Sequence, residues 1–145
     1  MKVSELLKIK GTRVITVGPN DTIYAAIQKL AENNIGALPV CDDKGMILGI
    51  ISERDLLKEC YHRSEAIQRT KVKEVMTKDI VIGLPEDTLD YVVSVMTQKA
   101  IRHLPIMSGA KVEGIVSMRD IVEAQLQESM AQVRYLGTYI SGGYS

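Results

Sequence analysis

Apolar and polar positions along this chain follow two periods, one typical of strands and one typical of helices. Residues 13–17 alternate between apolar and polar side chains, which predicts a short strand. In residues 22–33 the apolar positions recur at helical spacing. Asn20 or Asp21 stands where the capping residue of that helix is expected.

A β-hairpin and a second helix complete this unit. The apolar runs 37–41 and 46–51 flank a polar loop, and a helix begins at Ser52 and runs to about Glu59. Each unit therefore reads β-α-β-β-α. The same order returns as a strand at 80–82, a helix at 88–99, hairpin strands at 104–107 and 112–116, and a helix from Ser117.

The amino acids repeat as well as the pattern. Three segments recur at offsets of 66, 66 and 65 residues, and the one-residue change falls in the hairpin loop, where length changes are tolerated. Two units of about 70 residues would each be marginally stable alone, so we expect them to share a single core. The matching pairs are 19–22 with 85–88, 35–40 with 101–106, and 49–55 with 114–120.

The duplicated order predicts an α+β fold in which two β-α-β-β-α repeats pack about a pseudo-two-fold axis. We place repeat 1 at residues 1–65, repeat 2 at 66–126 and a C-terminal helical tail at 127–145, with a polar linker at 60–70. Apolar positions from 119 to 136 keep close to helical spacing. The tail then either packs on its own domain or grips a second copy of the chain.

Composition excludes several classes of function. Of the 145 residues, 46% are apolar, and 18 basic residues balance 18 acidic ones, so no net field favours nucleic acid or a membrane. Phe and Trp are absent, and no apolar run reaches the roughly 20 residues that span a bilayer. Cys41 and Cys60 form no metal or redox motif. We expect a cytoplasmic protein that binds neither nucleic acid nor membrane.

A Ser-x-Arg-Asp motif opens the last helix of each unit. Ser52 with Asp55, and Ser117 with Asp120, have the spacing of a capping box, in which each side chain bonds the other residue's backbone. The alternative is a ligand site. A helix N-terminus favours anions, a short carboxylate there can accept hydrogen bonds from vicinal ribose hydroxyls, and the adjacent arginine can reach phosphate oxygens.

With these motifs the chain resembles a tandem cystathionine-β-synthase (CBS) domain pair, or Bateman module, of the stand-alone type. The resemblance is carried by residues 49–55 and 114–120, together with 35–40 and 101–106, and it runs from about Lys2 to Leu126. It implies a regulatory module that binds adenosine nucleotides in clefts between the two repeats.

The resemblance also implies roles for twelve positions. Two aspartates would hold ribose hydroxyls, two serines the ribose or a phosphate, two apolar residues the adenine, and two strand-entry pairs would face the phosphates. Two arginines would complete a cationic centre between the clefts. In that order these residues are Asp55 and Asp120, Ser52 and Ser117, Ile15 and Val81, Gly36-Ala37 and Arg102-His103, and Arg54 and Arg119.

The repeats differ at the strand-entry positions, so the two clefts are expected to be unequal. The first repeat has the small pair Gly36-Ala37 where the second has Arg102-His103. A single histidine beside an apolar strand is more often packed than bound to a ligand. The neighbouring Arg102 and the position within the repeat nevertheless favour a ligand contact for His103.

The sequence contains no spacing typical of a catalytic triad, a phosphate loop or a metal site, so we expect no enzyme and no required cofactor. The implied ligand is AMP, ADP or ATP, ranked above NAD and S-adenosylmethionine. Four basic groups near the centre favour a phosphorylated ligand over the methyl donor. The implied partners are a second copy and an effector protein. The alternative is an interaction or dimerisation scaffold with little or no ligand binding.

Overall fold

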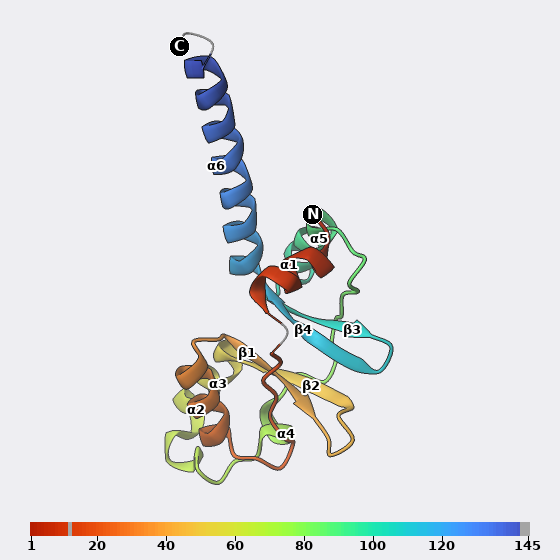
Figure 1. The fold of residues 1–145 in the computed structure, drawn as a ribbon. Helices are drawn as coiled ribbons and strands as arrows, with labels where there is room; N and C mark the ends of the chain where they lie inside the picture. Colours follow the sequence, from red (N-terminus) through yellow and green to blue (C-terminus); the bar gives the residue numbers. More distant parts are fainter. Residues whose placement is uncertain (12, 143–145) are drawn as a thin grey trace.

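The computed structural model describes residues 1–11 and 13–142, and the side chains up to residue 137. Two antiparallel hairpins lie between helices, with a long C-terminal helix projecting from the body (Figure 1). The predicted α+β class and the doubled order are confirmed. The elements are α1 (Val3–Lys10), α2 (Ile23–Asn33), β1 (Ala37–Cys41), β2 (Ile47–Ser52), α3 (Glu53–Arg63), η1 (Ser64–Ala66), α4 (Val72–Val75), α5 (Leu89–Lys99), β3 (His103–Ser108), β4 (Lys111–Ser117) and α6 (Met118–Gly142).

The two hairpins have the same register, as their repeated sequences predict. Leu38 pairs with Ile51 in the first hairpin, and Leu104 pairs with Val116 in the second. Each register shifts near the loop, after Val40 in β1 and after the equivalent Ile106 in β3. The buried faces of the hairpins therefore present equivalent apolar residues.

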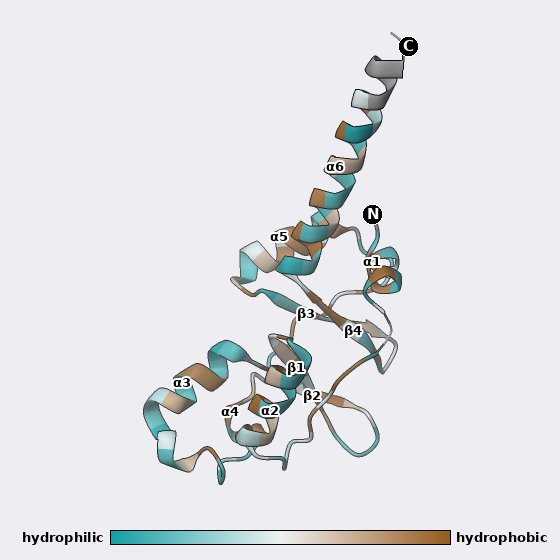
Figure 2. Cartoon of the chain, turned by 60° about the vertical axis from the view of Figure 1, so that its left-hand side comes forward, coloured by the Kyte–Doolittle hydropathy of each residue, from teal (hydrophilic) through white to brown (hydrophobic). Residues whose placement is uncertain are grey.

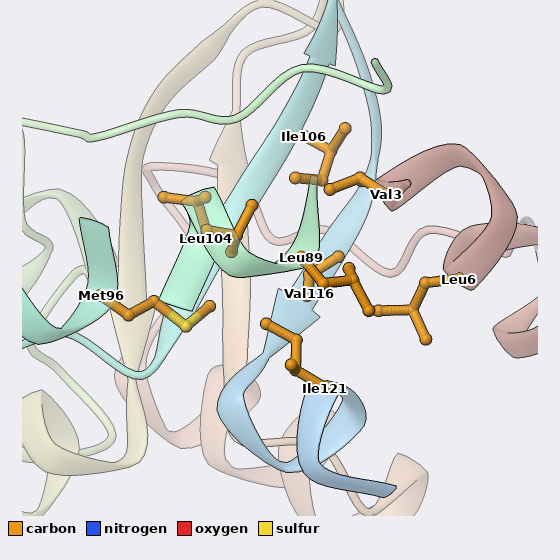
Figure 3. Close-up of a cluster of buried hydrophobic side chains, with 9 residues drawn as sticks. Val3, Leu6, Leu89, Met96, Leu104, Ile106, Val116 and Ile121 are labelled. Atoms are coloured by element: carbon orange, nitrogen blue, oxygen red, sulfur yellow. The ribbon is translucent and has the colours of Figure 1, made fainter. Parts of the chain in front are cut away.

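Two separate apolar cores form in place of the single shared core that we expected. Each hairpin packs against its own helices, so each repeat buries most of its own apolar face. Leu38, Val40 and Ile51 belong to the first core, together with α2. Figure 3 shows the second, in which Leu104 and Val116 meet α1, α5 and the start of α6.

Two helices that the sequence analysis did not predict, α1 and α4, exchange partners between the repeats. Helix α1 precedes repeat 1, but its Val3 and Leu6 side chains lie in the second core (Figure 3). Helix α4 precedes repeat 2, but its Val72 is buried in the first core. Each core is therefore completed by the segment that leads into the other repeat.

Backbone hydrogen bonds fix the two leading segments in the same way. The Val3 amide donates to the Asp87 carbonyl at 2.9 Å, and the Val72 amide donates to the Asp21 carbonyl at 2.8 Å. The segments also match in sequence, Lys-Val-Ser-Glu from residue 2 and Lys-Val-Lys-Glu from residue 71. This fourth repeated piece is the signal from which the exchange could have been predicted.

The strands predicted at 13–17 and 80–82 are wrong, since the chain makes a single parallel bridge to the hairpin at the end of the first segment and just after the second. Val17 bridges Val40, and Gly83 bridges Ile106. The next step of a parallel ladder would need an amide donor at Pro39 or Pro105, and proline has none. The ladder therefore stops after one residue pair.

Threonines, and not Asn20 or Asp21, cap the first helix of each repeat. The Thr22 hydroxyl accepts from the Ala25 amide, and the Thr88 hydroxyl accepts from the Tyr91 amide, both at 3.1 Å. Asp21 instead accepts from the Gly18 amide and closes the turn before the helix. The predicted linker is partly helical, because α3 continues to Arg63 and is followed by η1.

The C-terminal helix is confirmed, but most of its described length does not pack on its own domain. The first two turns of α6 reach the second core, through Met118, Ile121 and Ala124. Apolar residues recur along the projecting part (Figure 2), and every one of the large ones is more than half exposed. These are Val122, Leu126, Met130, Val133, Tyr135 and Leu136. The interpretation that the tail packs on its own domain is therefore wrong for these residues.

Candidate functional site

The Ser-x-x-Asp motifs form capping boxes at the N-termini of α3 and α6. The Asp55 carboxylate accepts from the Ser52 amide at 3.0 Å and from the Ser52 hydroxyl at 3.1 Å, and the Asp55 amide donates to that hydroxyl at 3.4 Å. In the second repeat Asp120 accepts from the Ser117 amide at 2.9 Å and its amide donates to the Ser117 hydroxyl at 3.0 Å. The capping interpretation is confirmed in both repeats.

Capping occupies only part of each carboxylate. Among the described residues, every side-chain hydrogen bond of Asp55 and Asp120 is made through Oδ2. Both aspartates are partly exposed. The second oxygen can therefore accept hydrogen bonds from a ligand while the first still fixes the helix N-terminus.

A lysine holds one of the two aspartates and not the other. Lys10, the last residue of α1, places its ammonium 2.7 Å from Asp120 Oδ2 and donates to the Ile115 carbonyl at 2.6 Å. Burial alone would raise the pKa of Asp120. The hydrogen bonds from Lys10 and Ser117 outweigh burial, and the pKa lies below its usual value. The Asp120 carboxylate is thus charged and already paired.

The strand-entry positions of the two repeats meet at the junction of the hairpins. A Cβ on Gly36 would lie 2.6 Å from Nε2 of His103 and 3.0 Å from Oε1 of Glu53. The imidazole of the second repeat therefore packs against the backbone of the first. The Glu53 amide donates to the Gly36 carbonyl at 2.9 Å, and the Met118 amide makes the equivalent bond to the Arg102 carbonyl at 2.8 Å.

Burial lowers the pKa of His103 below its usual value. Glu53 and Asp120 oppose this shift, while Lys10 and Arg102 add to it. The imidazole is therefore neutral at pH 7. The same four neighbours show that this junction gathers charged groups from α1, α3, α6 and the start of β3.

Of the three predicted arginines, Arg102 acts on His103 in this charged junction, and Arg54 and Arg119 are not among the groups that do. Arg54, Arg102 and Arg119 are exposed, and the Nε of Arg119 pairs with Glu123 one helical turn further along α6, at 3.1 Å. Lys10 and Arg102 are the basic groups that act on His103. Their roles toward a phosphate remain predictions.

The remaining predicted contacts lie in the extended segments before α2 and α5 and at the start of β1. Ile15 and Val81 belong to the extended segments before α2 and α5, where each packs partly buried against the core of its own repeat. Ala37 is buried at the start of β1. These positions can offer backbone groups and apolar surface to an adenine ring.

A separate wide groove opens on repeat 1 beside α4. Pro19, Leu48 and Met76 line it, with Lys73 and Lys78 at its edge. It contains none of the twelve predicted residues. In the part of the chain that the structure describes, no cluster of metal-ligating side chains occurs, and no helix is long and apolar enough to cross a membrane.

The family profile of the CBS domain matches this chain twice, at residues 3–62 and 72–127. The chain belongs to the CBS domain family. Both matched stretches include a leading segment, a hairpin and the Ser-x-Arg-Asp helix start described above. A pair of CBS domains is a regulatory module, and the repeat boundaries that we set at 1–65 and 66–126 stay a prediction.

Relatives and solved structures agree with this assignment. The chain is 31% identical to the mitochondrial CBS domain-containing protein CBSX3 of Arabidopsis thaliana, over 98% of this chain and 73% of that protein. It matches the CBS-domain protein ATU1752 from Agrobacterium tumefaciens with a TM-score of 0.82 and 37% identity, covering 86% of this chain and 99% of the other.

A further solved structure is the CBS domain pair of protein MJ0100 in complex with 5-methylthioadenosine and S-adenosyl-L-methionine. It matches with a TM-score of 0.78 and 26% identity, covering 88% of this chain and 98% of the other. Both of its ligands contain adenosine without a phosphate. Adenosine ligands are therefore bound within this family at a fold shared with the present chain.

Sequence reasoning missed Lys10, although it makes the closest side-chain contact to a predicted site residue of this CBS pair. Lys10 and Asp120 are 110 residues apart, and no local pattern links them. The repeated Lys-Val-x-Glu segments would have placed α1 on the second repeat. They would not have shown which lysine of that helix reaches the aspartate.

Proposed function

We propose that this protein is a non-catalytic regulatory module that binds adenosine nucleotides of the AMP, ADP and ATP class between its two CBS repeats. It acts as a ligand or energy-state sensor in the cytoplasm. The observation that carries the proposal is the pair of equivalent helix starts. In each, an aspartate keeps one carboxylate oxygen for the helix and leaves the other for a ligand.

The chemistry around these aspartates supports a ribose and a phosphate. A carboxylate is the common acceptor for the vicinal hydroxyls of a ribose, and charge-assisted hydrogen bonds of this kind are the strong ones. Lys10, Arg102 and the neutral His103 lie near Asp120 and can donate to phosphate oxygens. The apolar residues Ile15 and Val81 can face the adenine.

The MJ0100 complex supports the adenosine part of this proposal, since it holds two adenosine ligands in a related fold. Those ligands lack phosphate, so phosphate recognition rests on the basic groups of this chain. Isothermal titration with adenosine, AMP, ADP, ATP, NAD and S-adenosylmethionine ranks the ligands. We expect AMP, ADP or ATP to bind tightest.

The ribose role is tested by Asp120→Ala and Asp55→Ala, each titrated with AMP and with 2′-deoxy-AMP. Removing a charged acceptor should weaken AMP binding by about 1.5–3 kcal/mol at the affected site. The deoxy ligand should bind the wild type less well and lose little further in the variants. Asp90→Ala, an exposed acid on α5, is the control. Equal binding of AMP and 2′-deoxy-AMP by the wild type would contradict the ribose role.

A second candidate function is self-association, with the protein serving as a dimerisation scaffold. The exposed apolar side chains of α6 favour it, because the projecting part of this helix packs on no part of its own domain and needs another partner. The two functions are compatible. A homodimer whose stability depends on bound nucleotide could pass that state to an effector protein.

A further inference from the structure

Lys10 divides the two otherwise equivalent aspartates into one that is paired and one that is open. Its ammonium makes an ion pair with Asp120, and the side chains are 36% and 20% exposed. It also donates to the Ile115 carbonyl of β4. These contacts join the end of α1 to the start of α6, at the position where a ligand would meet Asp120.

The first repeat has no such lysine. The segment that completes the first repeat is the one containing α4, which runs 69 residues later in the sequence than the α1 segment, so the position equivalent to Lys10 is Asp79. The residue equivalent to Ile115 is Ile50, which exchanges two backbone hydrogen bonds with Thr77, at 2.9 and 3.0 Å. Among the described residues, Asp55 is bonded only by its own cap and makes no ion pair.

We propose that Lys10 is an exchangeable counter-ion that makes the Asp120 site selective for phosphorylated adenosine ligands. This inference rests on the proposed function and names the ligand class for one of its two sites. When ribose hydroxyls donate to the second oxygen of Asp120, they share the charge of one carboxylate with the ammonium on Oδ2. A phosphate on the same ligand provides a second anion for the ammonium, whereas a neutral nucleoside does not.

The physical basis is competition for the charge of the Asp120 carboxylate, which is only partly exposed. Lysine carries its charge on a flexible stem with rotatable donors, so Lys10 can turn from Asp120 toward a phosphate without moving α1. A neutral ligand shares the Asp120 carboxylate with the ammonium and brings no second anion, so it binds less tightly than a ligand whose phosphate pairs with Lys10. The Asp55 site imposes no such condition and accepts neutral adenosine ligands.

The test uses the full chain carrying Asp55→Ala, so that titration reports on the Asp120 site. Affinities for adenosine and AMP are measured with Lys10, Lys10→Gln and Lys10→Met. We expect AMP to bind this protein more tightly than adenosine. The ratio should fall about tenfold in either variant, equivalent to about 1.4 kcal/mol, as AMP binding weakens and adenosine binding improves.

Two controls separate charge from helix damage. Lys10→Arg keeps a cation and should retain the selectivity for AMP. Lys8→Gln removes an exposed charge from the same helix and should leave both affinities unchanged. An unchanged ratio of AMP to adenosine affinity in Lys10→Gln and Lys10→Met would overturn the inference while leaving the proposed function intact.

The ion pair is also measured without ligand. An NMR titration of the Asp120 carboxyl should give a higher pKa in Lys10→Gln than in the wild type, and an unchanged pKa would overturn the ion pair itself. If neither adenosine nor AMP binds the wild-type protein, the proposed function fails, and this inference fails with it.

Discussion

At the scale of single residues, the contact between the two repeats depends on a glycine. Gly36 has no side chain, and the His103 imidazole of the other repeat fills the space beside it. Gly36 does not have the positive φ that would require glycine for conformational reasons. Glycine is needed here for its small size, which leaves room for the His103 imidazole. This explains why the first repeat has Gly36 where the second has Arg102.

Gly36→Ala should therefore lower the free energy of unfolding by about 1–3 kcal/mol, the range for overpacking a well-packed site. The loss should shrink in the His103→Ala background, because the added methyl group then has room. Urea unfolding of the two single variants and the double variant measures the coupling. Gly137→Ala on α6, where a Cβ meets no atom within 4 Å, is the control and should be neutral or stabilising. Additive losses would show that the methyl group added by Gly36→Ala does not clash with His103.

At the scale of elements, each repeat is completed by a segment that precedes the other repeat. Helix α1 supplies Val3 and Leu6 to the second core, and α4 supplies Val72 to the first. Cutting the sequence between its repeats would thus remove part of both cores. The pairing also brings Lys10 to Asp120, so the exchange that stabilises the fold positions a charge at the candidate site.

Leu6→Ala should lower the free energy of unfolding by about 2–5 kcal/mol, as expected for a buried leucine. Its effect should appear in repeat 2, although Leu6 lies before repeat 1 in the sequence. Hydrogen exchange should show lost protection in β3, β4 and α5 more than in β1 and β2. Ile9→Ala, on the same helix but 68% exposed, is the matched control. Greater loss of protection in β1 and β2 would contradict the exchange.

Local patterns predicted the hairpins and their flanking helices because those elements follow hydrophobic periodicity. The four hairpin strands lie within one residue of their predicted ends. Helix α4 has only four residues, too few to show a helical period, and is stabilised by its contact with the first core. Pro39 and Pro105 reduce the first predicted strand of each repeat to a single bridge, an effect that depends on which neighbour that strand would pair with. Lys10 was missed for a similar reason, because its contact with Asp120 depends on how α1 packs on the second repeat.

At the scale of the whole molecule, α6 is the element without a partner. It has 25 residues and so extends for about 38 Å, of which the first two turns pack on the second core. Val122 and Leu126 continue the exposed apolar surface toward the body, and the equivalent residues of α3, Leu57 and Tyr61, are exposed as well. Helices α3 and α6 thus expose apolar side chains at equivalent positions of the two repeats, and these form one apolar surface in each repeat. A symmetric homodimer would cover both copies of that surface.

The last prediction tests whether α6 joins two copies of the chain. Truncation after Gln125 should weaken self-association and leave nucleotide binding largely intact, since Asp120 and its cap precede the cut. Met130→Glu, which puts a charge on the apolar surface, should weaken the dimer in the same way. Ala131→Glu makes the same chemical change at an exposed position on the other side of the helix, and it should have little effect. Light scattering of the four proteins, with and without AMP, measures their mass.

Nucleotide should also raise the melting temperature of the full chain by an amount that grows with the nucleotide concentration, because it binds only the folded state.

If the dimer transmits ligand binding, AMP should shift the monomer–dimer dissociation constant of the full chain. AMP should leave the mass of Met130→Glu unchanged at concentrations where that variant is a monomer. A ligand changes such an equilibrium only through different affinities for its two states. A monomeric full chain, at concentrations up to those used for light scattering and with or without AMP, would rule out the homodimer. The apolar surface of α6 would then belong to a contact with a different protein, and the sensor would act as a monomer on its effector.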